Sequence, residues 1–195
     1  MVVALVLLAL AAVAAVAGIA IYNGLVGRRN AYRNAFSQID VQLKRRHDLV
    51  PNLVETAKAY LEHERETLES VVRARGQAAQ AIQRAARAPG DPVAMQALAG
   101  AEGALSASLS RLLAVAEAYP DLKANATMAS LMEELASTEN RIAFARQAYN
   151  DAIMDYGVAR ESFPGSLVAS SFGFREAAAY DTAVGAEREP VKVSF

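Results

Sequence analysis

The chain has 195 residues, a formal net charge of −1 at pH 7, and neither cysteine nor tryptophan. A charge this close to zero creates no overall field that attracts a polyanion, so nucleic acid is not an expected partner. The lack of cysteine excludes disulfides, thiolate nucleophiles and cysteine-ligated metal centres. Alanine, leucine, glutamate, arginine and glutamine are abundant, which favours helix. We therefore expect an all-α protein with one soluble domain of ordinary size.

The N-terminal segment is apolar. No charged side chain occurs from Met1 to Ile21, and the first one is Arg28. Twenty-one helical residues rise about 31 Å, which is enough to cross a hydrocarbon core of roughly 30 Å. The alternative is a cleaved signal peptide, but its apolar stretch is usually shorter and follows Lys or Arg. We predict a transmembrane helix over residues 1–22, which anchors the chain in a membrane.

Charges beside the predicted anchor indicate its orientation. The short N-terminus carries no basic side chain, whereas Arg28 and Arg29 follow the apolar segment. The positive-inside rule then favours a cytoplasmic soluble domain, with a periplasmic one as the alternative. Tyr22, Arg28 and Arg29 are predicted at the membrane interface, where tyrosine rings lie at headgroup depth and arginines meet anionic lipid. Membrane lipid is thus an expected partner.

Residues 23–165 contain four segments whose apolar side chains recur at steps of three and four, the pattern of amphipathic helices. These segments are 23–49, 51–87, 92–119 and 125–163. Their short, proline-containing connections predict an antiparallel bundle of about four long, proline-kinked helices. The first is expected to end near Leu49, because Pro51 lacks an N–H group and its ring clashes with the preceding turn. Since the apolar stripe keeps its phase across Pro51, one long kinked helix is the alternative.

Residues 166–195 are predicted to form an extended C-terminal tail. Phe172, Phe174 and Tyr180 lie close together in it and form an aromatic docking segment, which is expected to pack on the bundle or on a neighbouring subunit. Residues 191–195 could form a short strand, which would be marginal in isolation.

The densest run of charge extends from Lys44 to Asp48. The simpler interpretation is a solvated face at a helix end, where cations favour the negative end of the helix dipole. The alternative is an interface in which these residues pair with Glu139 and Arg141, between helices or between subunits. The predicted interface residues, with the aromatic tail included, are Asp40, Lys44, Arg45, Arg46, Asp48, Glu139, Arg141, Phe172, Phe174 and Tyr180.

The motifs of common catalytic sites are missing. A di-metal site in a helical bundle needs Glu-x-x-His on two helices, but the residues three positions before His47 and His63 are Lys44 and Tyr60. The sequence also lacks HExxH, a glycine-rich phosphate loop and GxSxG. We therefore expect no catalytic residue, cofactor or metal.

Three segments resemble the signature of the LemA family. They are SQIDVQLKRRHDLVPNLVETAKAYLEHE from Ser37, AVAEAYPDLKAN from Ala114 and STENRIAFARQAYNDAI from Ser137. The segments have the family's order and spacing, and the resemblance extends from Ile21 to Phe174. It implies a bacterial helical bundle that is anchored in the inner membrane by a single span. The family includes a protein associated with magnetosome membranes and is discussed alongside a membrane-embedded zinc metalloprotease.

Two functional hypotheses follow. The first is a non-enzymatic, membrane-anchored scaffold that self-associates into a homo-oligomer, possible because anchoring in one plane raises the effective concentration of weak lateral contacts. The second is an adaptor or regulator of the membrane-embedded zinc metalloprotease in envelope stress. The second depends on the family resemblance alone.

Overall fold

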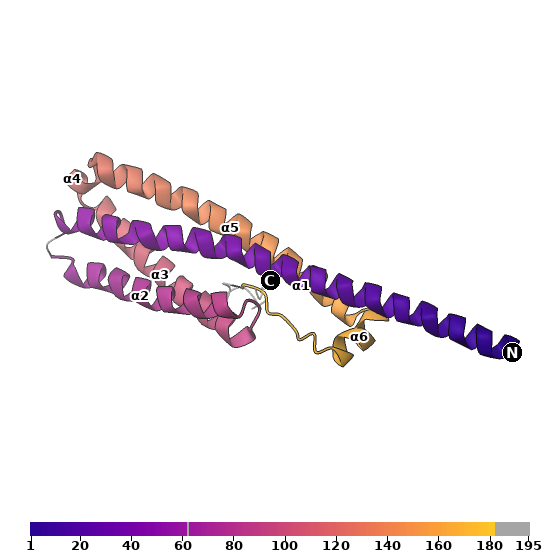
Figure 1. Cartoon of the computed structure of the whole chain (residues 1–195). Coiled ribbons are helices and arrows are strands. Elements are labelled where there is room, and N and C mark those ends of the chain that lie inside the picture. The colour runs from indigo at the N-terminus through magenta and orange to yellow at the C-terminus, as the bar shows by residue number, and fades with distance from the viewer. Residues whose placement is uncertain (62, 182–195) are drawn as a thin grey trace, which may run out of the picture.

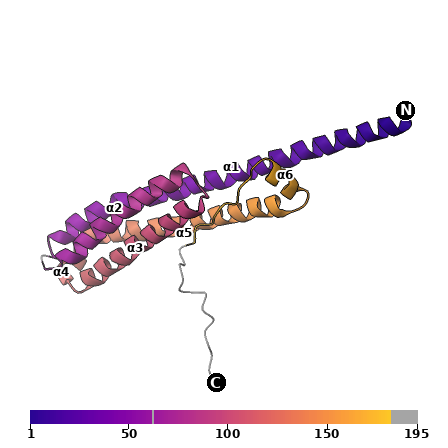
Figure 2. The ribbon, with the colours of Figure 1, turned by 90° about the horizontal axis from the view of Figure 1, so that it is seen from below.

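The computed structural model describes residues 1–61 and 63–181, and this part of the chain forms helices and no strand. The helices are α1 (Val2–Lys58), α2 (Arg65–Arg87), α3 (Pro92–Glu117), α4 (Pro120–Lys123), α5 (Ala126–Glu161) and α6 (Gly165–Ser171). Four of them, α1, α2, α3 and α5, form an antiparallel bundle, and α1 extends far beyond it at the N-terminal end (Figures 1 and 2). The predicted all-α fold is confirmed.

The helix boundary predicted near Leu49 is wrong. The first helix continues through Pro51, and the chain reverses only between Lys58 and Arg65. The alternative of one continuous helix is therefore correct up to Lys58. Leu53 and Ala57, which follow the proline, are fully buried in phase with the stripe before it.

The bundle interior has two hydrophobic clusters, one after the other along its length. The anchor-side cluster joins α1 around Phe36 to α5 around Tyr149, to the end of α2 and to the start of α3. The far cluster joins the last turns of α1 to α2, α3 and the start of α5. Helix α1 packs on α5 and on α2, while α2 packs on α3.

The turn between α2 and α3 is built from a cap and a glycine. The Asp91 side chain accepts a hydrogen bond from the Ala94 N–H at 2.9 Å, and Pro92 begins α3. Gly90 has φ +88°, and a Cβ there would lie 2.9 Å from the Cβ of Ala177. This turn therefore packs closely on the C-terminal segment, which crosses it.

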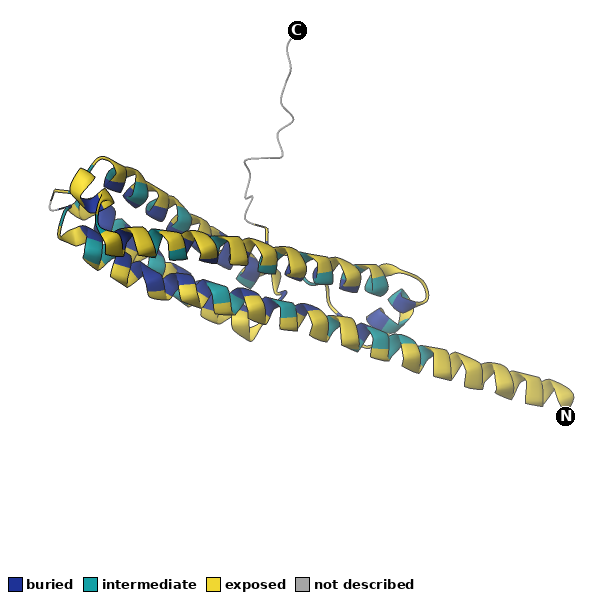
Figure 3. Ribbon diagram, turned by 90° about the horizontal axis from the view of Figure 1, so that it is seen from above, coloured by how far each residue is buried: buried dark blue, intermediate teal, exposed yellow. Residues whose placement is uncertain are grey.

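The N-terminal part of α1 projects from the bundle as a single helix. Residues 1–17 are all exposed (Figure 3). In the described part of the chain, α1 is the helix that contains a stretch long and apolar enough to cross a membrane, and none of that stretch is buried. Its length and composition agree with the predicted anchor.

The C-terminal segment lies on the bundle as far as the structure describes it. The extended tail predicted from residue 166 on is wrong at its start, because the residues up to Ser171 belong to α6 and residues 172–173 form a turn. Residues 174–181 form neither helix nor strand, and we call them the strap. Phe174 and Tyr180 in the strap are buried, and α6 contacts both α1 and α5. The short strand considered for residues 191–195 falls outside the described residues.

Candidate functional site

A layer of polar side chains crosses the bundle between the two hydrophobic clusters. All four long helices contribute to this charged layer, which consists of Arg46, His47, Arg75, Glu102, Ser106 and Glu139. Arg46 and Glu102 are each 2% exposed, so these two opposite charges are removed from water. Buried charges of this kind need partners with good geometry.

Arg46 is the centre of the layer. Its Nη2 pairs with a carboxylate oxygen of Glu102 on α3. Its Nη1 donates to Glu139 Oε1 on α5 at 2.7 Å and lies 3.2 Å from Ser106 Oγ on α3. The solvated face predicted here is wrong for Arg46 and His47, because acceptors from two other helices replace water. The alternative pairing with Glu139 is present, and it lies within one chain.

His47 shares the carboxylate of Glu102, with its Nε2 at 3.0 Å from Oε1. The pKa of His47 is lowered to about 4, mainly by its burial and also by the positive charges of Arg46 and Arg75, while Asp48 opposes the shift. The imidazole is therefore neutral at pH 7. Since the carboxylate can only accept, Nε2 carries the hydrogen and donates it. Glu102 thus accepts from two buried donors on α1.

Arg75 on α2 explains why α1 continues through Pro51. A proline leaves the carbonyl four residues earlier without its helical N–H donor, and that carbonyl belongs to His47. The Nε of Arg75 donates to this carbonyl oxygen at 2.7 Å. The acceptor that Pro51 leaves open is thus satisfied by a neighbouring helix.

The hydrogen bond from Arg75 to the His47 carbonyl, which Pro51 leaves without a helical donor, can be tested by a double-mutant cycle. Arg75→Met should lower the free energy of unfolding by about 1–3 kcal/mol, because it leaves the His47 carbonyl without a donor. In a Pro51→Ala background the alanine N–H can bond the same carbonyl, so the loss should be clearly smaller. Urea denaturation of the four variants in detergent, followed by circular dichroism, measures the coupling. Equal losses in both backgrounds would contradict this account.

His47 should make stability fall between about pH 6.5 and pH 4. In the unfolded chain the imidazole protonates near pH 6.5, whereas in the folded chain it stays neutral until about pH 4. The unfolded state then binds the extra proton, so stability is full above pH 6.5 and is lost as the pH falls, by about 3 kcal/mol in total. The measurement is the urea midpoint at a series of pH values.

The matched control for this prediction is His47→Gln, which keeps a donor toward Glu102 but does not titrate. Its stability should depend less on pH than that of the unmodified chain over the same range. Identical pH profiles for the chain and His47→Gln would show that the imidazole is not held neutral.

Other members of the predicted interface lie outside the layer. Lys44 pairs with Asp40 at 2.6 Å on one turn of α1, and Arg45 pairs with Glu134 of α5 rather than with Glu139. Asp48 is exposed. These contacts are exposed or half-buried and are worth little individually. Arg141 is also exposed, and contacts between subunits through these residues stay a prediction.

The residues predicted at the membrane interface meet the C-terminal segment. The Tyr22 ring centroid lies 5.0 Å from that of Phe172 and 5.4 Å from that of Phe174, both in edge-to-face geometry. The guanidinium of Arg29 lies 5.0 Å from the centroid of Phe174. Arg28 is exposed, with its Nη1 3.4 Å from the Gly24 carbonyl oxygen. Tyr22 is half-buried under the tail instead of projecting freely.

The predicted aromatic docking segment separates into parts. Phe172 is 66% exposed, whereas Phe174 and Tyr180 are buried on their own bundle. The side chain of Asn150 holds the backbone of Tyr180, accepting from its N–H at 2.8 Å and donating to its carbonyl at 3.3 Å. Tyr149 donates its hydroxyl to a strap carbonyl, that of Ala178, at 2.8 Å. Docking within the chain therefore accounts for two of the three aromatics.

Sequence reasoning missed Glu102, Arg75 and Asn150. A signal for Glu102 exists, because it is the one acidic residue between Asp91 and Glu117. It also lies one helical turn from Leu98, on the apolar stripe. No signal marked Arg75 or Asn150, whose partners are backbone groups distant in sequence. Within residues 1–61 and 63–181, no group of three His, Asp or Glu side chains could hold a metal ion.

Known proteins support the membrane and family assignments. The chain is 30% identical over 179 residues to magnetosome protein MamQ of Magnetospirillum gryphiswaldense, a match that covers 80% of this chain and 66% of the relative. It is 36% identical over 88 residues to magnetosome proteins MamQ 1 and MamQ 2 of Paramagnetospirillum magneticum. Each of these two matches covers 45% of this chain and 32% of the relative. The chain thus spans less than two thirds of the length of these relatives.

The sequence profile of the LemA family matches residues 35–195, which include the charged layer and the strap. The three signature segments fall within that range. Glu139 and Arg46, which form an ion pair across α1 and α5, belong to two different signature segments. This protein, with its long apolar N-terminal helix and helical bundle, is a membrane-associated member of the LemA family.

Proposed function

We propose that this protein is a non-enzymatic scaffold that is anchored in the bacterial inner membrane and self-associates at its surface. The observation that carries the proposal is α1, which continues from the exposed apolar segment into the bundle core without a break. Because α1 is one continuous helix, the bundle is rigidly connected to the anchor. The bundle lies on the cytoplasmic side by the positive-inside argument from Arg28 and Arg29.

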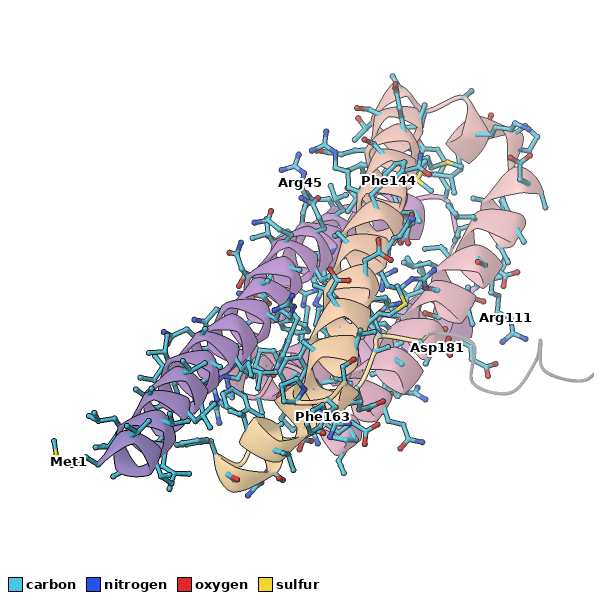
Figure 4. The ribbon with its side chains drawn as sticks, turned by 90° about the vertical axis from the view of Figure 1, so that its right-hand side faces the viewer. Met1, Arg45, Arg111, Phe144, Phe163 and Asp181 are labelled. Carbon is cyan, nitrogen blue, oxygen red and sulfur yellow. The ribbon has the colours of Figure 1, made fainter. Side chains whose placement is uncertain are left out.

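The outer face of α5 supports self-association. Phe144 is 72% exposed, Met154 62% and Val158 60%. Phe144 is labelled on α5, the helix that packs along α1 (Figure 4). Large apolar side chains gathered on one outer face are typical of protein contacts. Copies held in one plane meet at high effective concentration, so modest contacts of this kind suffice.

The test is the mass and shape of the full-length protein in mild detergent, by size-exclusion with light scattering and electron microscopy. We expect a large, regular particle. Phe144→Asp should reduce its mass while circular dichroism stays unchanged. Val93→Asp, at a side chain 76% exposed at the start of α3, is the matched control and should leave the particle intact. A monodisperse monomer at all concentrations would overturn the proposal.

The second candidate function is an adaptor for a membrane-embedded zinc metalloprotease. It is favoured by an open groove of about 800 Å³ between the ends of α1 and α2, which Leu61, Leu68 and Val72 line together with charged side chains. Val72→Asp should then abolish co-purification with the protease and leave the oligomer unchanged. Retained co-purification would exclude the groove as the docking site.

A further inference from the structure

The segment from Ser162 to Phe174 differs from the rest of the bundle in its lack of charge. It is the longest stretch without Asp, Glu, Lys or Arg after the N-terminal apolar segment, and Glu161 and Arg175 bound it. Helix α6 lies within it. A surface segment of a soluble bundle normally carries charged side chains.

Three large apolar side chains of this segment point outward. Phe163 is 81% exposed, Leu167 60% and Phe172 66%, and we call these three residues the α6 patch. The polar side chains nearby are satisfied locally, because the hydroxyls of Ser170 and Ser171 bond the Leu167 carbonyl at 3.0 and 2.8 Å. The hydroxyls of Ser170 and Ser171 therefore do not depend on hydrogen bonds from water.

Helix α6 lies at the end of the bundle nearest the N-terminus (Figures 1 and 2). Phe163 and Gly165 line one groove together with Ala20 and Ile21 of α1. Phe172 contacts Tyr22, with the ring centroids 5.0 Å apart. The patch is thus level with the last residues of the apolar segment, not with the middle of the bundle.

This level is where a spanning helix leaves the hydrocarbon core. If residues 1–21 cross about 30 Å of hydrocarbon, the boundary falls at Ile21 and Tyr22. Exposed Phe and Leu side chains beside that boundary reach the zone between headgroups and acyl chains. Arg28 and Arg175 are exposed nearby and suit anionic headgroups.

We propose that the α6 patch is a second membrane contact, inserted into the lipid interface beside the anchor. The proposal rests on the membrane anchoring in the proposed function but not on self-association. A single helix leaves a bundle free to rotate and tilt, whereas a second contact on one side fixes which face of the bundle turns toward the membrane. The α6 patch therefore fixes the rotation of the bundle about the anchor helix.

Because the chain has no tryptophan, one can be introduced as a depth probe. Leu167→Trp reports on the α6 patch, and Val41→Trp, at a side chain 55% exposed on α1, is the matched control. Val41 lies about 30 Å further along α1 than Ile21. Each full-length variant is reconstituted at low protein density into phosphatidylcholine–phosphatidylglycerol vesicles. Its fluorescence is then quenched with lipids labelled near the headgroup and, separately, with aqueous iodide.

We expect the tryptophan at position 167 to emit at shorter wavelength than the one at position 41. The labelled lipid should quench the tryptophan at 167 several-fold more than the one at 41, and iodide should quench the one at 41 more strongly. Equal quenching of both by iodide would overturn the proposal. Protection from both quenchers would also overturn it, because a second copy of the chain would then cover the α6 patch. Vesicle flotation tests the membrane anchor separately. A chain that does not float with the vesicles would contradict the proposed membrane anchoring as well. A chain that floats but fails the quenching test would contradict only the proposed lipid contact of the α6 patch.

Discussion

Replacing Glu102 with alanine should lower the free energy of unfolding by about 3 kcal/mol or more, the usual result of removing one partner of a buried ion pair. Two donors lose their acceptor in this variant, the guanidinium of Arg46 and the Nε2–H of His47. Arg46 is only 2% exposed, so water cannot easily take the place of the carboxylate. Thermal melting of the full-length protein in detergent, followed by circular dichroism, measures the effect.

Two further variants separate charge pairing from loss of packing. Glu139→Ala should cost much less, because the Glu139 side chain is 42% exposed and Arg46 keeps Glu102. The double variant Arg46→Met/Glu102→Leu should recover only the part of the loss that comes from the unpaired Arg46, since apolar residues of similar volume often replace a buried pair without penalty. The Nε2–H of His47 still lacks its acceptor in this variant. If Glu102→Ala and Glu139→Ala melted alike, the layer would not be centred on Glu102.

Ending the chain after Gly173 should strongly destabilise the bundle, although the helices themselves stay complete. Phe174 and Tyr180 are 6% and 2% exposed, and the burial of each large side chain is worth about 1.5–3 kcal/mol. The hydroxyls of Tyr149 and Tyr156 would also lose the strap carbonyls that accept from them at 2.8 Å. We expect a large fall in melting temperature.

The control is a chain that ends after Asp181, which keeps every contact of the strap described above. It should melt close to the full-length protein. A chain ending after Gly173 that melted like the control would show that the strap is dispensable, and the aromatic tail would then be free to dock on another subunit. The comparison thus decides whether Tyr180 serves its own bundle.

Periodicity was sufficient wherever one helix face decides burial. Leu98, Leu105 and Leu112 of α3, and Met128, Leu135 and Ile142 of α5, are buried as their spacing predicts. The apolar residues 1–17 likewise form an exposed stretch of helix. Each of these features depends on residues a few positions apart, which is the range that helix geometry controls.

Non-local contacts decided the rest. The sequence by itself determined the all-α class, the apolar anchor segment and most core positions, because these follow from local spacing and side-chain polarity. Only the tertiary structure decided that α1 continues through Pro51, because the missing donor is supplied by Arg75 of another helix. It also decided that Arg46 is buried and that the strap covers its own bundle, because the acceptors of Arg46 and the side chains that hold the strap come from segments distant along the chain.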